Sequence, residues 1–258
     1  MSTGSDQGDA PIVRMVGVRK GFGRVSVLHN VSLEFAEGQT TVVLGPSGCG
    51  KTVMLKHLLG LLKPDRGAVW FRNTRIDTLP EQRLGPIRRQ FGFLFQKGAL
   101  FDSMSVRENV GFPLLEHTTL TADQREQRVR EVLRMVEMTG SIDKMPTDLS
   151  GGQAKRVALA RAIVLEPKVL LYDEPTTGLD PIRAEVINQL IIKLQRELNI
   201  TSIVVTHDLA SAFKVADLIV MFYDGTVVMQ GTPEEFRSST NVIVQRFLDG
   251  KASGEPLA

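Results

Sequence analysis

The fold is decided by residues 41–52, which read TVVLGPSGCGKT. The first four residues are apolar or β-branched and predict a buried strand, and residues 51–62 predict the helix that follows. Between them lies the phosphate-loop pattern G-x-x-x-x-G-K-[ST], matched at Gly45, Gly50, Lys51 and Thr52. This order of strand, loop and helix favours a nucleotide-binding α/β protein, and a plain glycine-rich turn is the alternative.

The loop has the composition that a phosphate site needs. Its glycines carry no Cβ, so successive backbone N–H groups can point inward, and the helix N-terminus adds a partial positive charge. Lys51 is predicted to reach the β- and γ-phosphates of ATP, and the Thr52 hydroxyl to bind Mg²⁺. The predicted nucleotide-binding residues here are Gly45, Pro46, Ser47, Gly48, Cys49, Gly50, Lys51 and Thr52.

A second apolar run, residues 169–172, ends in two adjacent carboxylates, Asp173 and Glu174. Pro175 follows and cannot continue a central strand, so both carboxylates are predicted at the strand's C-terminal edge, where parallel sheets bind ligands. Asp173 is predicted to bind Mg²⁺. Since adjacent residues of an extended strand point in opposite directions, Glu174 is left to act on the attacking water. A solvated acidic turn is the alternative.

The pentapeptide LSGGQ, residues 149–153, is a second candidate anion site. It opens a helix predicted over 153–164, whose first N–H groups can bind an anion together with the Ser150 hydroxyl. An ordinary Ser/Gly helix cap is the alternative. Placed after a phosphate loop and before a strand that ends in Asp-Glu, this pentapeptide resembles the signature of the ATP-binding-cassette (ABC) family of transporter ATPases.

The resemblance implies an α/β fold, the P-loop NTPase fold of an ABC nucleotide-binding domain. That fold has a RecA-like core, an N-terminal antiparallel β subdomain and a helical signature subdomain. It also implies a head-to-tail homodimer that hydrolyses ATP to ADP and phosphate and drives membrane permease subunits. The signature residues that would close on the partner's ATP are Ser150, Gly151, Gly152 and Gln153.

Further residues match positions of the family. Phe22 resembles the aromatic that stacks on adenine, and an aromatic at the edge of the core is the alternative. Gln96 resembles the glutamine that links Mg²⁺ and the water to the transporter interface. Asp180 resembles the residue that communicates between the two ATP sites. His207 ends an apolar run and resembles the histidine that contacts the γ-phosphate, although a lone histidine is more often structural. The resemblance thus assigns catalytic roles to Gln96, Glu174 and His207.

Composition argues against other classes of protein. The chain has 258 residues, 42% of them hydrophobic, and a net charge of +2 with scattered Lys and Arg indicates no nucleic-acid partner. The single cysteine, Cys49, allows no internal disulfide and fits a reducing cytosolic setting. No apolar stretch approaches the roughly 20 residues of a membrane span, and the polar residues 1–10 show no secretory signal. Any membrane role is therefore expected to come through a partner.

Local signals mark out the organisation of the chain. Ser105 opens a capping box for a short helix, and an apolar face around Val132 predicts a second. A hairpin is predicted to turn at Asp224-Gly225, and a capping box at Thr232 to open the final helix. The predicted division is a disordered 1–10, an ABC ATPase domain over 11–250 with its helical subdomain at about 97–150, and a disordered 251–258.

The cargo is indicated by shorter stretches. Residues 95–103 and 245–250 resemble the Mla/Mce-type lipid-transport ATPases of bacterial envelopes. That resemblance implies phospholipid transport across the bacterial envelope. It places the chain peripherally at the cytoplasmic face of the inner membrane, with a permease, a periplasmic MCE-type lipid-binding protein and a small regulatory subunit as partners. The alternatives are a transporter for another cargo, such as an amino acid or a drug, and a soluble ABC ATPase without a transporter.

Overall fold

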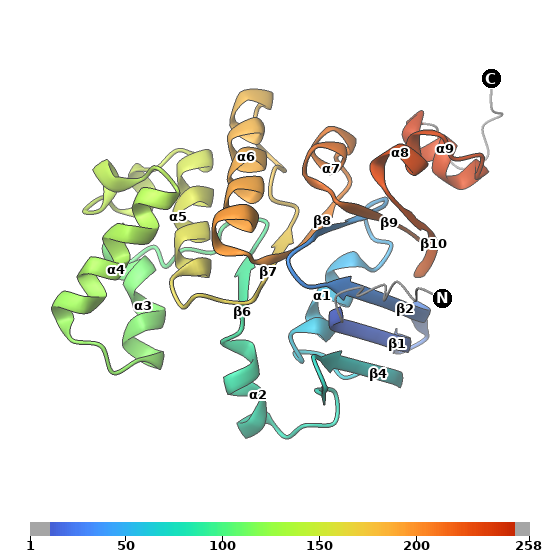
Figure 1. The fold of residues 1–258 in the computed structure, drawn as a ribbon, viewed down its shortest axis with the longest axis horizontal. Helices are drawn as coiled ribbons and strands as arrows, with labels where there is room; N and C mark the ends of the chain where they lie inside the picture. The colour runs from blue at the N-terminus through green and yellow to red at the C-terminus, as the bar shows by residue number, and fades with distance from the viewer. Residues whose placement is uncertain (1–10, 251–258) are drawn as a thin grey trace, which may run out of the picture.

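The strand before the phosphate loop lies inside a six-stranded sheet of order β10-β9-β3-β8-β7-β6 (Figure 1). The computed structural model describes residues 11–250. All neighbouring strands of this sheet are parallel except β10, which runs antiparallel to β9. The strands are β3 (Thr40–Leu44), β6 (Phe91–Leu94), β7 (Val169–Asp173), β8 (Thr201–Thr206), β9 (Leu218–Tyr223) and β10 (Thr226–Gly231). Every residue of β3, β7 and β8 is buried, as continuous apolar runs predict for strands covered on both faces.

A second, antiparallel sheet of order β2-β1-β4-β5 is the expected N-terminal β subdomain. Its strands are β1 (Pro11–Phe22), β2 (Val25–Ala36), β4 (Arg66–Phe71) and β5 (Thr74–Arg75). Helix α1 (Lys51–Leu58) shares one core with this sheet and with one face of the parallel sheet. Phe35, Val43 and Met54 represent the three layers of that core. The end of β1 is thereby held near the phosphate loop.

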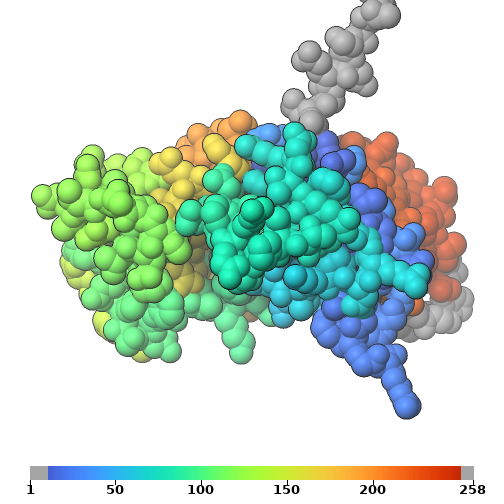
Figure 2. Space-filling model, turned by 90° about the horizontal axis from the view of Figure 1, so that it is seen from below, coloured from blue at the N-terminus to red at the C-terminus, as the bar shows by residue number. Residues whose placement is uncertain are grey.

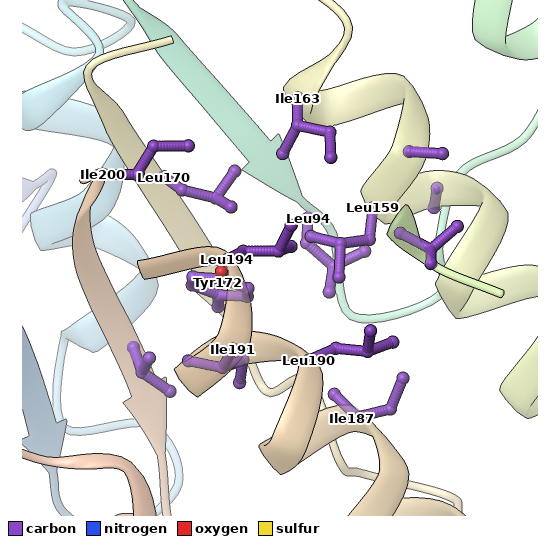
Figure 3. Close-up of a cluster of buried hydrophobic side chains, with 14 of the residues drawn as sticks. Leu94, Leu159, Ile163, Leu170, Tyr172, Ile187, Leu190, Ile191, Leu194 and Ile200 are labelled. Atoms are coloured by element: carbon purple, nitrogen blue, oxygen red, sulfur yellow. The ribbon is translucent and has the colours of Figure 1, made fainter. Parts of the chain in front are cut away.

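Helices cover the other face of the parallel sheet. Leu159 and Ile163 from α5 (Gly151–Ile163), and Leu190 and Leu194 from α6 (Pro181–Leu198), surround the fully buried Tyr172 of β7 (Figure 3). Burial of each such aliphatic side chain contributes about 1.5–3 kcal/mol to folding. The remaining helices of this face are α7 (Leu209–Val215), α8 (Pro233–Arg237) and α9 (Val242–Leu248).

The stretch between β6 and α5 is helical, as the sequence predicts. It holds α3 (Val106–His117), α4 (Ala122–Met135) and the 3-10 turns η1 (Thr139–Ser141) and η2 (Pro146–Asp148). Ser105 and Thr121 each form a capping box at the start of the next helix. The green residues of this segment form one end of the molecule in Figure 2. Whether 97–150 acts as a separate subdomain stays a prediction.

Several element ends differ from the predictions. Helix α1 ends at Leu58, not at residue 62, because Gly60 adopts φ +64° and the N–H groups of Leu61 and Leu62 bond back to the Lys56 carbonyl. The hairpin turns at Asp224-Gly225 as predicted. Thr232 caps α8 as predicted, but α8 is not the final helix, because α9 follows it. Helix α2 (Glu81–Arg88) leads into β6. The predicted disorder of 1–10 and 251–258 lies outside the described residues.

Candidate nucleotide-binding site

The predicted site residues meet at one edge of the parallel sheet because of its register. Leu44 lies opposite Thr206, and Asp173 lies opposite Val205. The residues that follow β3, β7 and β8 therefore leave the sheet side by side at its C-terminal edge, where α/β sheets bind ligands. Gln96, two residues after β6, completes the edge. The predicted position of Asp173 and Glu174 at the C-terminal edge of their strand is confirmed.

A cavity of about 460 Å³ opens at this edge. Its lining residues are Phe22, Val27, Ser47, Gly48, Gly50, Lys51, Thr52, Val53, Gln96, Asp173 and Glu174. Gly48 has φ +81°, and a Cβ built on it would meet no atom within 4 Å, so the backbone is open to a ligand there. At Gly45 a Cβ would lie 2.1 Å from the Phe222 carbonyl oxygen of β9, so this position also needs a glycine for packing. It allows close strand packing, and neither Gly45, Pro46 nor Cys49 lines the cavity.

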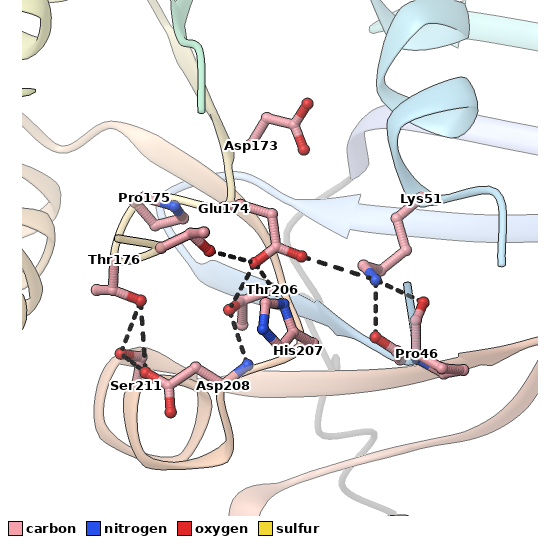
Figure 4. Close-up of polar contacts among 12 residues, drawn as sticks. Pro46, Lys51, Asp173, Glu174, Pro175, Thr176, Thr206, His207, Asp208 and Ser211 are labelled. Atoms are coloured by element: carbon pink, nitrogen blue, oxygen red, sulfur yellow. Dashed lines mark hydrogen bonds and ion pairs between the residues drawn. The ribbon is translucent and has the colours of Figure 1, made fainter. Parts of the chain in front are cut away.

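Lys51 places a buried ammonium in this cavity. Its Nζ donates to the carbonyl oxygens of Gly45 (2.7 Å) and Pro46 (2.9 Å), and lies 3.8 Å from Glu174 Oε1 (Figure 4). Cys49, in the same loop, is buried, and this burial raises the pKa of its thiol. The cysteine therefore stays protonated and suits the small-residue role rather than redox chemistry.

Two oxygen ligands are ready for a cation. Thr52 Oγ1 donates to Asp173 Oδ1 and Oδ2 at 3.1 and 3.2 Å. Burial raises the pKa of Asp173, and the Thr52 hydrogen bond partly opposes that rise. Within residues 11–250 no group of three or more His, Cys, Asp or Glu side chains forms a metal cage. A hydroxyl and one carboxylate beside a phosphate loop fit Mg²⁺, which takes its other ligands from phosphates and water.

Glu174 is held by three hydrogen-bond partners. Its Oε2 lies 2.9 Å from His207 Nδ1, and it accepts bonds from the hydroxyls of Thr177 (3.1 Å) and Thr206 (3.4 Å), as Figure 4 shows in part. The predicted reason for its direction is wrong. Glu174 is no longer part of the extended strand, since β7 ends at Asp173 and Glu174 has φ +52°. A left-handed turn, not strand alternation, points this carboxylate at the cavity.

Comparison with known proteins decides the family. The model of the ABC transporter family matches residues 28–177. The chain belongs to the ABC transporter family. It is 42% identical to the intermembrane phospholipid transport system ATP-binding protein MlaF of Haemophilus influenzae over 88% of this chain and 86% of that one. It is 40% identical to the probable ribonucleotide transport ATP-binding protein mkl of Mycobacterium leprae over 94% of this chain and 70% of that one.

Solved structures agree with this assignment. The dimeric ATP-binding cassette MJ0796, in a post-hydrolysis state bound to ADP and Pi, has a TM-score of 0.79 and 36% identity, covering 86% of this chain and 98% of that one. The ABC fold and its ATP hydrolysis coupled to transport, both implied by the signature, are thus confirmed. No helix within residues 11–250 is long and apolar enough to span a bilayer.

The ABC signature lies apart from the phosphate-loop cavity of its own chain. Ser150 caps α5, accepting a bond from the Gln153 N–H at 3.4 Å, while Gln153 Oε1 accepts one from the Ser150 N–H at 2.9 Å. None of residues 150–153 lines the cavity. The side chains of Leu179 and Arg183 lie next to Gly151 and Gly152 instead. Asp180, which caps α6, therefore belongs spatially with the signature rather than with Lys51.

Phe22 lies at the cavity with 47% of its surface exposed, too open for a core aromatic. Lys20 Nζ lies 5.5 Å from its ring centroid. Asp65 fixes this end of β1, since its carboxylate accepts bonds from Lys20 Nζ (2.8 Å) and the Gly21 N–H (2.7 Å). Asp65 and the buried Lys155 of α5 were both missed by sequence reasoning, because neither belongs to a motif.

Proposed function

We propose that this chain is the ATP-hydrolysing subunit of an ABC transporter that moves phospholipid across the bacterial envelope, bound at the cytoplasmic face of the inner membrane. The assignment of phospholipid as the cargo rests on the 42% identity to MlaF over most of both chains. The mkl relative favours a second candidate cargo, a ribonucleotide, but the match leaves a larger part of that protein uncovered.

The site residues support a division of roles. The backbone N–H groups of the loop and Lys51 would hold the phosphates, and Phe22 would stack on the adenine. When bound by Thr52 and Asp173, with Gln96 nearby, Mg²⁺ would neutralise charge on the β- and γ-phosphates. Glu174, oriented by Thr177 and His207, would take the proton of the attacking water.

A head-to-tail dimer would complete this site. Ser150 lies outside the cavity that holds Lys51, so a second chain must supply a signature to the γ-phosphate. The Ser150 hydroxyl accepts the Gln153 bond and keeps its own O–H for donation to a phosphate oxygen. Asp180, beside the signature, would lie at the seam between the two ATP sites.

The permease would dock beside Gln96. A groove of about 570 Å³ there is lined by Phe93, Phe95, Phe101, Phe112 and Arg161 among others. Phe95 and Phe101 are 46% and 43% exposed, unusual for such large apolar side chains. A permease helix in this groove would contact the residue before Gln96, which links cargo movement to hydrolysis. We include an MCE-type periplasmic protein and a small regulatory subunit among the partners, on the resemblance to Mla/Mce systems.

Co-purification tests this function. The tagged chain, isolated from detergent-solubilised membranes, should bring a permease and a lipid-binding protein, and the complex in vesicles should move a fluorescent phospholipid when ATP is added. Phe101→Asp should lose the permease while the isolated subunit still binds ATP. A complex that moves ribonucleotides would favour the second cargo, and a chain that brings no membrane protein would contradict the transporter.

A further inference from the structure

Lys155 is a buried cation of α5 that the proposed mechanism leaves without a role. Its side chain is 6% exposed, and the residue lies two positions after Gln153, the last residue of the signature. Its Nζ donates to the carbonyl oxygens of Pro175 (2.6 Å) and Thr177 (2.8 Å), with a longer contact to that of Glu174 (3.4 Å). Among residues 11–250 these three main-chain oxygens are its hydrogen-bond partners, so the ammonium grips a backbone turn rather than a carboxylate.

That turn carries the hydrolytic carboxylate. Glu174 begins it with φ +52°, and the Thr177 hydroxyl at its end donates to Glu174 Oε2. The Thr177 N–H also bonds back to the Glu174 carbonyl at 3.3 Å. Lys155 therefore holds the two ends of the turn that decide where Glu174 points. A buried ammonium is tolerated only with such partners, and its removal would leave the carbonyl oxygens of Pro175 and Thr177 without this donor.

We infer that Lys155 is a positioning residue, which fixes the Glu174–Thr177 turn and ties the position of the signature to the hydrolytic carboxylate of the same chain. The signature opens α5, and Lys155 lies on the same continuous helix. A shift of α5, when its signature engages the partner's ATP, would pass through Lys155 to this turn. The same turn leads into Asp180, which caps α6. The inference rests on the proposed role of Glu174.

The test compares three variants of the full-length chain in steady-state ATP hydrolysis. Lys155→Met keeps the apolar stem but removes the donors, and should lower kcat by about tenfold to a hundredfold, as small misplacements of catalytic groups do. The KM for ATP should change less than about threefold, because the phosphate loop is untouched. Lys155→Arg, which retains charge and donors, should recover most of the kcat. Lys193→Met is the matched control, since Lys193 Nζ also donates to a main-chain carbonyl, that of Met135 at 3.2 Å, away from the site.

A double variant separates positioning from general stability. In a Glu174→Gln background, Lys155→Met should lower residual turnover no further, since both changes act through one group. A Lys155→Met protein with wild-type kcat would overturn the inference. So would a double variant whose turnover falls below that of Glu174→Gln alone by the same factor that Lys155→Met causes in the wild-type chain. If Lys155→Met does not fold, Lys155→Gln replaces it, and unchanged kcat there overturns the inference equally. Normal turnover by Glu174→Gln alone would instead refute the proposed role of Glu174.

Discussion

At the scale of single residues, Asp173 shows a conflict between function and stability. Burial raises its pKa, so the folded protein holds this proton more tightly than the unfolded chain does. The stability that the protonated form contributes is lost as pH rises through the folded pKa, and at neutral pH the carboxylate destabilises the fold. Asp173→Asn should therefore raise the melting temperature without Mg²⁺ by about 2–4 °C per kcal/mol recovered, while abolishing Mg²⁺-dependent hydrolysis.

Asp77 is the matched control for Asp173, because its pKa is shifted in the opposite direction. Burial acts to raise its pKa, but bonds from the Arg75 side chain and the Val69 N–H outweigh that effect and lower it. Its carboxylate stabilises the fold above the unfolded pKa, so Asp77→Asn should lower the melting temperature at neutral pH and leave hydrolysis intact. Calorimetry of both variants at neutral pH and again near pH 4 measures whether each substitution raises or lowers the melting temperature. A lowered melting temperature in Asp173→Asn would contradict the account of that residue.

Motifs predicted individual residues where the chemistry demands a fixed residue type at a fixed spacing. Lys51, Thr52 and Asp173 are of this kind, and the structure brings them to one cavity. The burial of Lys155 was not predicted, because a lysine within a helix usually faces solvent. A signal was present, since Gly152 and Leu159, three residues before it and four after it, share its buried face. The helical spacing therefore indicated that Lys155 is buried, although lysine is usually an exposed residue.

At the scale of elements, the removal of two helix caps of the same kind should have different effects on hydrolysis. Ser150 and Thr121 each accept a bond from the N–H three residues on, at 3.4 and 3.3 Å, and Gln153 and Gln124 complete the two capping boxes. Changing either to Ala should lower the free energy of unfolding by about 1 kcal/mol. Ser150→Ala should also lower hydrolysis by tenfold or more, because the proposed bond from the Ser150 hydroxyl to a charged phosphate, worth about 1.5–3 kcal/mol, would be lost. Equal ATPase rates in the two variants would show that Ser150 is only a cap.

Element existence was predictable, and element ends were less so. The three central strands are continuous apolar runs because both their faces are covered, and periodicity finds them. Helix α1 stops at Leu58 because of the left-handed Gly60, a choice that composition leaves open. Helix α9 was missed because its seven residues are too short for a periodic signal, and its Asn241 cap is a common turn residue.

At the scale of the whole molecule, the sequence could not reveal the order of the strands. The phosphate-loop strand and the strand of Asp173 are separated by β8, which comes later in the chain than either. This insertion brings Thr206 and His207 next to the Glu174 carboxylate, whose other oxygen faces Lys51 (Figure 4). Such long-range pairing depends on tertiary packing, and the local periodicity of the sequence gives no information about it.

The same arrangement predicts how the molecule associates. Glu174→Gln keeps the size of the side chain and its contacts to Thr177 and His207 but removes the proton acceptor. Two such chains should bind ATP and accumulate as a dimer, with turnover reduced about 10²–10⁴-fold, the usual contribution of a general base. Light scattering with Mg·ATP and with ADP measures the association. Glu185→Gln, which changes a surface carboxylate paired with Lys214, should hydrolyse normally and dissociate after each turnover. A Glu174→Gln chain that stays monomeric in saturating ATP would mean that the signature does not reach a neighbour's nucleotide, since two anion sites on one phosphate should hold the chains together until it is cleaved.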